Sequence, residues 1–177
     1  MIITISGMPG SGKSTVGKIL AKQLGYRFYS MGDLRGKMAL ERGMKLDELN
    51  KLGESEEWTD REVDEYQKKL GQTEDNFVID GRLSWYCVPQ SFKVFLTVKI
   101  EEGARRIFKK QRPDEQHAAT VEDMVAQIRS RVASDNTRYR KWYGVQFDDP
   151  KNYNLTLDTT ALPPKQVVAR IRRTLPA

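Results

Sequence analysis

The chain has 177 residues, enough for one globular domain and too few for a two-domain enzyme. Hydrophobic residues make up 38% and charged residues 31%, and no run approaches the roughly 18 apolar residues that a membrane span needs. The chain starts with a β-rich run where a signal peptide would be basic and then apolar, and a lone cysteine, Cys87, cannot close an intramolecular disulfide. These features predict a soluble cytoplasmic protein that does not contact membranes, with Cys87 as a small buried hydrophobe.

The formal net charge is +6, and the basic excess is concentrated between Arg105 and Lys141. This segment contains ten basic and five acidic residues. A solvated helix face, a nucleic-acid patch and a site for a small polyanion such as a nucleotide would each produce this excess. Composition alone does not choose among the three.

β-rich runs and segments with apolar residues at helical spacing alternate along the chain. In chain order the predicted elements are a strand at 2–6, a helix at 13–24, a strand at 26–29, helices at 33–42, 46–52 and 59–70, strands at 77–80 and 94–98, helices at 101–111 and 120–143, a strand at 154–158 and a helix from the proline pair at 163–164. A capping box at Thr59 and Glu62 is expected to open the helix at 59–70. Strands alternating with helices predict an α/β fold with a parallel sheet covered on both faces.

A glycine-rich segment directly follows the first predicted strand and opens the first helix. It fits the phosphate-binding pattern G-x-x-x-x-G-K-[ST], in which the glycines turn backbone N–H groups inward, the lysine reaches the β- and γ-phosphates and the hydroxyl after it can bind Mg²⁺. The predicted ATP-binding residues in this segment are Gly7, Gly10, Ser11, Gly12, Lys13, Ser14 and Thr15. The sequence therefore predicts a site for ATP or GTP.

Asp80, Gly81 and Arg82 end a predicted buried strand. A carboxylate there lies beside the phosphate loop and can orient Mg²⁺ through water, while an arginine two residues later projects over the strand ends. The alternative is a simple turn with a surface ion pair.

The helix at 120–143 has an apolar seam in which Asp135 takes one position. Arg131 and Arg138 lie on the same face and are expected to pair with it. This polar stretch indicates either a structural ion-pair cluster or the wall of a polar ligand site. Under the structural interpretation, Asp135→Leu would be neutral or stabilising.

Arg106 and Lys110 share one face of the preceding helix, and residues 112–119 beyond it have no core pattern. Together they predict a short lid that folds basic side chains over phosphates, although a plain solvated face remains the alternative for the two basic residues.

These motifs together resemble the nucleoside monophosphate kinases, and among them the cytidylate kinases in their short archaeal-type form. The resemblance runs from the phosphate loop through Ser30 to Asp33 and Asp80-Gly81-Arg82 to the Arg131, Asp135 and Arg138 pattern, and so covers nearly the whole chain. It implies a P-loop NTPase fold, a three-layer α/β/α sandwich around a five-stranded parallel sheet. One domain over residues 1–177 would carry a helical insert for the monophosphate at about 33–72 and a lid at about 111–138.

The resemblance also implies a reaction and roles for the residues. The γ-phosphoryl group of ATP would pass to CMP or dCMP, with Mg²⁺ held by Ser14 and, through water, Asp80; Lys13, Arg82, Arg131 and Arg138 would be catalytic. Arg106 and Lys110 would face the donor. The implied acceptor-binding residues are Ser30, Asp33, Arg35, Asp80, Gly81, Arg82, Arg131, Asp135 and Arg138.

The sequence departs from the family at one position. These kinases usually carry an arginine three residues after Asp33, where this chain has Gly36, with Arg35 one place earlier. Asp64 and Gln67 are candidates for shaping the base pocket, as are Trp85 and Tyr86, for which core packing is favoured.

The sequence alone leaves several alternative functions to consider. A GTPase switch would need a late Asn-Lys-x-Asp motif, which the sequence lacks. An ATP-dependent nucleic-acid protein would fit the positive charge, and kinases acting on AMP, UMP, shikimate or dephospho-coenzyme A would fit the phosphate loop. A monomer that binds ATP and a nucleoside monophosphate, with no nucleic-acid partner, is the favoured expectation.

Overall fold

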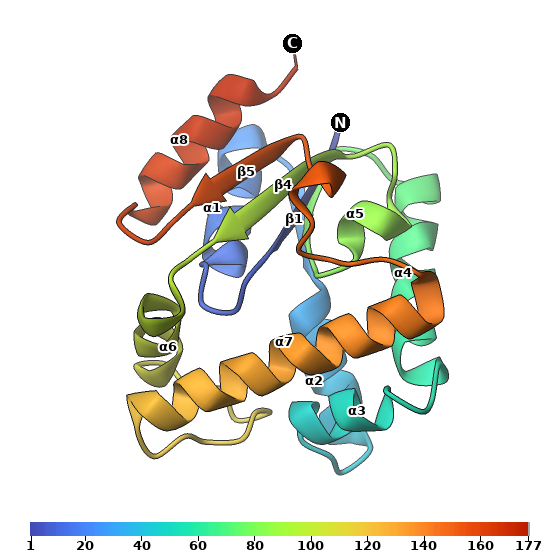
Figure 1. Cartoon of the computed structure of the whole chain (residues 1–177). Coiled ribbons are helices and arrows are strands. Elements are labelled where there is room, and N and C mark those ends of the chain that lie inside the picture. Colours follow the sequence, from blue (N-terminus) through green and yellow to red (C-terminus); the bar gives the residue numbers. More distant parts are fainter. Residues whose placement is uncertain (177) are drawn as a thin grey trace.

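A computed structural model of the protein describes residues 1–176 and shows, within them, one sheet of five parallel strands. The order across the sheet is β2-β3-β1-β4-β5, and every neighbouring pair is parallel (Figure 1). The strands are β1 (Ile2–Gly7), β2 (Arg27–Ser30), β3 (Phe77–Asp80), β4 (Phe92–Thr97) and β5 (Leu155–Asp158). The predicted α/β class and its five-stranded parallel sheet are confirmed.

Helices cover both faces of this sheet. The helices within the described residues are α1 (Lys13–Leu24), α2 (Met31–Glu41), α3 (Leu46–Leu52), α4 (Trp58–Thr73), α5 (Ser84–Cys87), α6 (Ile100–Phe108), α7 (Val121–Tyr143) and α8 (Pro164–Thr174), with a 3₁₀ turn at Pro150–Asn152. Helices α1 and α8 bury their apolar residues against one face, and α4, α5 and the C-terminal part of α7 do so against the other. The result is the three-layer α/β/α sandwich.

The strands bury apolar side chains on both faces, as parallel strands do. Ile3 and Ile5 of β1 face the layer of α1 and α8, whereas Phe77 and Ile79 of β3 face the opposite layer. Cys87 is buried among the residues of that second layer and takes the hydrophobic role expected of it.

Two local features mark helix ends. Helix α1 ends at Gly25, which adopts φ 70°, and Thr120 accepts a hydrogen bond from Asp123 N at the start of α7. The capping box predicted at Thr59 and Glu62 is wrong. Thr59 lies inside α4, where its hydroxyl donates to the Glu56 carbonyl at 3.1 Å, because the preceding turn already continues into the helix.

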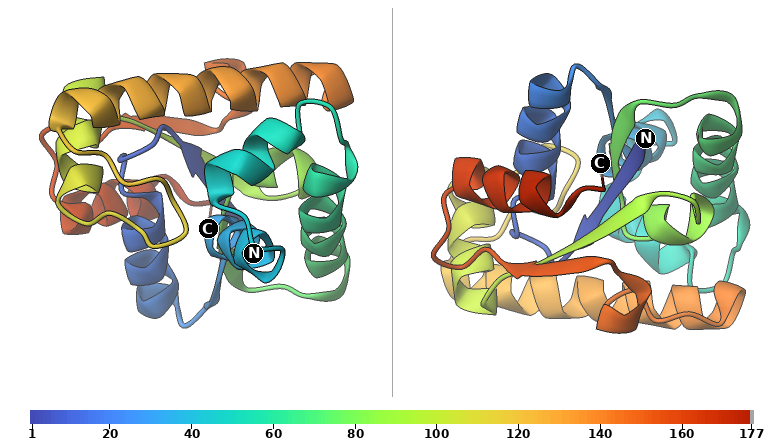
Figure 2. Two further views of the ribbon diagram at one scale, coloured as in Figure 1. Left: turned by 90° about the horizontal axis from the view of Figure 1, so that it is seen from below. Right: turned by 90° about the horizontal axis from the view of Figure 1, so that it is seen from above.

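The sheet places the candidate site residues at the carboxyl ends of the central strands. The phosphate loop follows β1, and the adjacent strand β3 ends in Asp80, which pairs in register with Ile5. Seen from below (Figure 2, left), α7 spans the molecule from α6 at one end to α4 at the other, and the loop after α6 reaches toward α3. None of the helices within residues 1–176 is both long and apolar enough to cross a membrane.

Candidate active site

A cavity of about 1010 Å³ opens at the carboxyl ends of the strands. The phosphate loop, α2 to α4, the turn after β3, the α6–α7 loop (residues 109–120) and α7 all contribute to its walls. Sixteen of the predicted site residues line it, namely Gly10, Ser11, Gly12, Lys13, Ser14, Thr15, Asp33, Arg35, Asp80, Gly81, Arg82, Arg106, Lys110, Arg131, Asp135 and Arg138. Gly7 and Ser30 do not.

The phosphate loop is folded so that the amine of Lys13 lies against the loop backbone. Gly10 and Gly12 adopt positive φ, and an added Cβ at Gly10 would overlap the backbone of Gly103 in α6. The Lys13 amine donates to the carbonyls of Gly7 and Met8 at 3.0 and 3.1 Å. Burial, together with the charge of Arg82, lowers the pKa of Lys13 to about 7.

Ser14 and Asp80 meet beside this loop. The Ser14 hydroxyl donates to Asp80 Oδ2, while Asp80 Oδ1 is buried without a hydrogen-bond partner. Burial raises the pKa of Asp80, although the Ser14 hydrogen bond favours its charged form. An unpartnered carboxylate oxygen beside a hydroxyl is a donor set that fits Mg²⁺ or one of its water ligands.

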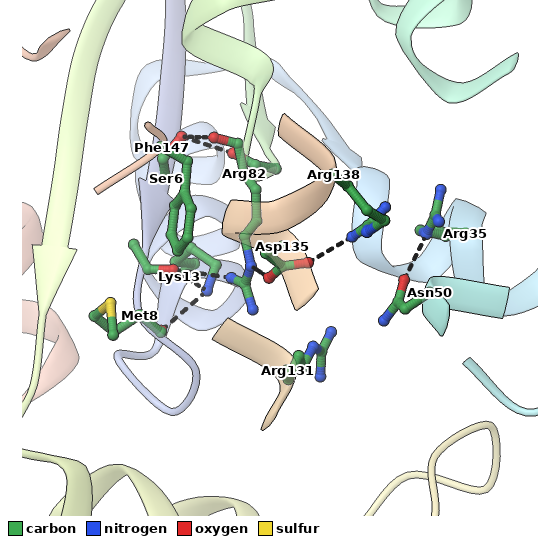
Figure 3. Close-up of polar contacts among 12 residues, drawn as sticks. Ser6, Met8, Lys13, Arg35, Asn50, Arg82, Arg131, Asp135, Arg138 and Phe147 are labelled. Atoms are coloured by element: carbon green, nitrogen blue, oxygen red, sulfur yellow. Dashed lines mark hydrogen bonds and ion pairs between the residues drawn. The ribbon is translucent and has the colours of Figure 1, made fainter. Parts of the chain in front are cut away.

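A chain of alternating charges runs from Arg82, beside the phosphate loop, to Arg35 of α2, and Figure 3 shows its first part, from Arg82 through Asp135 to Arg138. Asp135 accepts from Arg82 Nε on one side and from Arg138 Nη2, at 2.6 Å, on the other. Arg138 also contacts Asp60, which pairs in turn with Arg35 at 2.9 Å. Burial opposes the charge of Asp135, but Arg82 and Arg138 outweigh it and lower its pKa to about 2.

The expected pairing of Arg131 with Asp135 is wrong. Arg131 Nη1 instead contacts Glu115 Oε1 of the α6–α7 loop at 2.7 Å. Side chains on a helix lean toward its N-terminus, so Arg138 leans back onto Asp135 whereas Arg131 leans away from it. Arg82, arriving from the end of β3, takes the second carboxylate oxygen. Figure 3 shows the Arg131 side chain without a contact to Asp135.

Two predicted residues that do not line the cavity hold neighbouring parts of the site in position. Ser30 caps α2, its hydroxyl accepting from Asp33 N at 3.3 Å, and the Gly7 carbonyl accepts from Lys13 and Arg82. Arg106 donates to the carbonyls of Gly10, Thr159 and Thr160 and so ties the phosphate loop to the segment after β5.

Sequence reasoning missed several polar residues of the cavity. Asp60 links Arg35 to Arg138, Asn50 accepts from Arg35 Nε at 2.9 Å, and Glu115 holds Arg131. Arg112 reaches Asp33 of α2 at 2.9 Å from the α6–α7 loop. No local pattern marks these residues, because each contact joins segments that are distant in the chain.

The candidates for the base pocket divide into two groups. Asp64 and Gln67 line the cavity. Trp85 is packed in the core, as favoured from the sequence, and Tyr86 is exposed at 37% of its surface; neither belongs to the lining.

This geometry agrees with the comparisons to known proteins. Residues 2–161 match the cytidylate kinase-like family. The chain is 36% identical to a cytidylate kinase of Natronomonas pharaonis over 96% of this chain and 86% of that protein, and 34% identical to one of Pyrococcus abyssi over 97% and 92%. The chain belongs to the cytidylate kinase-like family. It is therefore a nucleoside monophosphate kinase, and the family resemblance expected from the motifs is confirmed.

Solved structures show the same fold at lower identity. A shikimate kinase from Bacteroides thetaiotaomicron aligns with a TM-score of 0.66 and 17% identity over 98% of this chain and 97% of that one. A shikimate kinase from Acinetobacter baumannii aligns with a TM-score of 0.62 and 20% identity, over 97% and 90%. At such identities the likeness confirms the P-loop kinase fold alone.

Proposed function

We propose that this kinase transfers the γ-phosphoryl group of ATP to CMP or dCMP, giving ADP and CDP or dCDP. The observation that carries the proposal is that one cavity joins the phosphate loop to guanidinium groups from α2, the end of β3 and α7. The relatives named cytidylate kinase support the choice of acceptor. Such a cluster of cations favours the binding of a second polyanion opposite ATP.

The reaction needs positioning and charge neutralisation more than proton transfer. An oxygen of the acceptor phosphate attacks the γ-phosphorus, and the bond from that phosphorus to the bridging oxygen of ADP breaks. The attacking oxygen is already anionic, so no general base is required, which agrees with the exposed position of His117 away from the cavity lining.

The basic side chains of the cavity have separate roles in this phosphoryl transfer. Lys13 and Arg82 lie beside the phosphate loop and would neutralise charge on the transferred group, joined by Arg131 once it leaves Glu115. Arg35 Nη2 and Arg138 Nε are buried without partners, so both retain donors for the acceptor phosphate. Asp135 is a positioning residue that aligns Arg82 with Arg138, and Asp33 and Gly81 complete the acceptor wall.

Ser14 and Asp80 would hold Mg²⁺ directly or through water, and the ion would supply charge neutralisation for the ATP phosphates. Arg106 and Lys110 would face the donor nucleotide. We assign residues 33–72 to acceptor binding and residues 111–138 to the lid; a monomer in the cytoplasm remains the expectation.

A substrate panel tests the proposal. ADP release from ATP and Mg²⁺ is measured with CMP, dCMP, UMP, AMP, GMP and shikimate as acceptors. We expect CMP and dCMP to give the highest kcat/KM. Turnover with shikimate alone, or turnover only on added nucleic acid, would replace the proposal with one of its rivals.

A further inference from the structure

A buried polar pair on α4 lines the same cavity as the phosphate loop. Asp64 and Gln67, here called the α4 pair, are three residues apart and so share one helix face. They are 5% and 2% exposed, yet both line the cavity. The charge chain described above does not use either of them.

Hydrogen bonds fix the orientation of both side chains. Ser84 Oγ donates to Gln67 Oε1 at 2.6 Å, and Gln67 Nε2 donates to Asp64 Oδ1 at 3.1 Å. The Tyr143 hydroxyl donates to Asp64 Oδ2. The opposite amide orientation would place Gln67 Oε1 against a carboxylate oxygen. One hydrogen of Nε2 is therefore spent on Asp64, and the other remains available.

Asp64 is a buried carboxylate whose neighbouring arginines are engaged elsewhere. Arg35 and Arg138 both pair with Asp60, one helical turn before Asp64 on α4. Burial raises the pKa of Asp64 to about 6, so the group is still ionised at pH 7.5. A buried charge with no ion-pair partner is unfavourable for stability, which indicates a role in ligand binding.

The α4 pair therefore presents a hydrogen-bond acceptor and a donor side by side. Each carboxylate oxygen can accept two hydrogen bonds, so Asp64, which accepts from Gln67, Tyr143 and Cys87, has one site left beside the free Nε2 hydrogen of Gln67. Cytosine carries the complementary pattern, an exocyclic amine that donates next to a ring nitrogen that accepts. Uracil carries the reverse, an oxygen that accepts next to an N–H that donates.

We propose that Asp64 and Gln67 recognise the base of the acceptor nucleotide, Asp64 accepting from its exocyclic amine and Gln67 donating to the adjacent ring nitrogen. This rests on the proposed function, because it takes the acceptor to be a nucleoside monophosphate. Its phosphate would lie on the arginines around Asp60, one turn from the α4 pair. The same pattern occurs in adenine and is reversed in guanine, so the α4 pair excludes UMP and GMP, and cavity shape separates CMP from AMP.

Asp64→Asn is the decisive variant, because it keeps the shape and replaces an acceptor with a group that can donate to the oxygen of uracil. With saturating ATP at pH 7.5, we expect the ratio of kcat/KM for CMP to that for UMP to fall about ten- to hundredfold, the factor for one charge-assisted hydrogen bond. The KM for ATP should not change. Glu65→Gln, at the exposed neighbouring position on α4, is the matched control and should leave the ratio as it is.

A second measurement uses the wild-type enzyme and a CMP analogue in which hydrogen replaces the 4-amino group. We expect its kcat/KM to be about ten- to hundredfold below that of CMP, and the difference to shrink in Asp64→Asn. Equal rates for CMP and the analogue in the wild type, or an unchanged CMP to UMP ratio in a folded Asp64→Asn variant, would overturn the assignment. Absence of CMP phosphorylation by the wild type would instead refute the proposed function itself.

Discussion

Asp135 occupies a helix position whose neighbours along the seam are apolar, and its tertiary contacts explain why. Its two carboxylate oxygens take Arg82 and Arg138, and all three side chains are largely buried. The sequence allowed a neutral or stabilising Asp135→Leu. The structure argues against that outcome, because leucine would leave two buried guanidinium groups without their shared counter-charge.

We predict that Asp135→Leu lowers the free energy of unfolding by about 3–5 kcal/mol, the cost of breaking a buried ion pair by removing one partner. For a chain of this size that corresponds to a fall in Tm of roughly 6–20 °C, measured by thermal denaturation. Glu122→Gln, at an exposed position in the first turn of the same helix, should change Tm by no more than about 2 °C. An unchanged Tm for Asp135→Leu would show that the arginines find other partners.

The pKa of Lys13 predicts a proton linkage in ATP binding. In the free protein Lys13 is mostly neutral above pH 7, since burial and Arg82 lower its pKa to about 7. Phosphates favour the charged amine, so ATP binding should take up a proton at pH 8, and affinity should fall as pH rises from 7 to 9. Calorimetry in buffers of different ionisation enthalpy measures the uptake, and Lys13→Met should abolish it. Binding without proton uptake at pH 8 would contradict the lowered pKa.

The contact between α2 and the α6–α7 loop explains why a glycine fits at position 36. A Cβ built at Gly36 would overlap Asp114 Oδ2, and Arg112 Nη2 lies 3.1 Å from the same point. The loop is therefore docked where a side chain at position 36 would stand. Arg112, paired with Asp33 and Asp114, places a guanidinium group beside α2.

We predict that Gly36→Ala releases the α6–α7 loop from α2 without unfolding the helix, because alanine favours helix while its methyl group displaces Asp114. Amide hydrogen exchange at residues 112–118 should become at least several-fold faster. Gly32→Ala is the matched control on the same helix, since its nearest neighbour would be Ser30 Oγ at an ordinary 3.9 Å. Equal exchange in the two variants would show that the loop does not depend on this close approach.

The cavity is enclosed by segments that meet through polar contacts. Leu46 N donates to the Asp114 carbonyl at 2.8 Å, the Lys45 amine to the Pro113 carbonyl at 2.6 Å, and Arg131 holds Glu115. Within residues 112–119 only Asp114 and Ala118 are buried, so few apolar contacts anchor the loop. Such segments open at low free-energy cost.

We therefore predict that residues 112–119 exchange amide hydrogens rapidly in the free protein and slowly with a bisubstrate analogue that joins ATP to CMP. The phosphates would provide new partners for Arg112 and Arg131 and hold the loop closed. Residues of β1 and β3, buried in the sheet, serve as internal controls that should not change. Identical exchange of residues 112–119 in the two states would contradict a role for them as a lid.

Local patterns in the sequence were enough to predict much of the protein. The phosphate loop lies within nine consecutive residues, and the alternation of strands and helices follows from apolar periodicity, so both are visible before folding. The helices at 13–24 and 46–52 have the predicted bounds. Gly25 and Thr120 act as helix ends because capping depends on neighbouring backbone atoms alone.

The tertiary structure decided which side chains meet. Arg131 was expected to pair with Asp135, four residues away, but it pairs with Glu115, sixteen residues away. Asp60 joins Arg35 to Arg138 across three helices. The orientation of Gln67 depends on Ser84 in another helix. Such contacts are set by helix packing and by the direction in which each Cα–Cβ bond points, which a one-dimensional pattern does not contain. For this kinase, local patterns were enough to predict the fold class, the family and sixteen of the residues around the cavity, whereas their partners depend on how the helices pack.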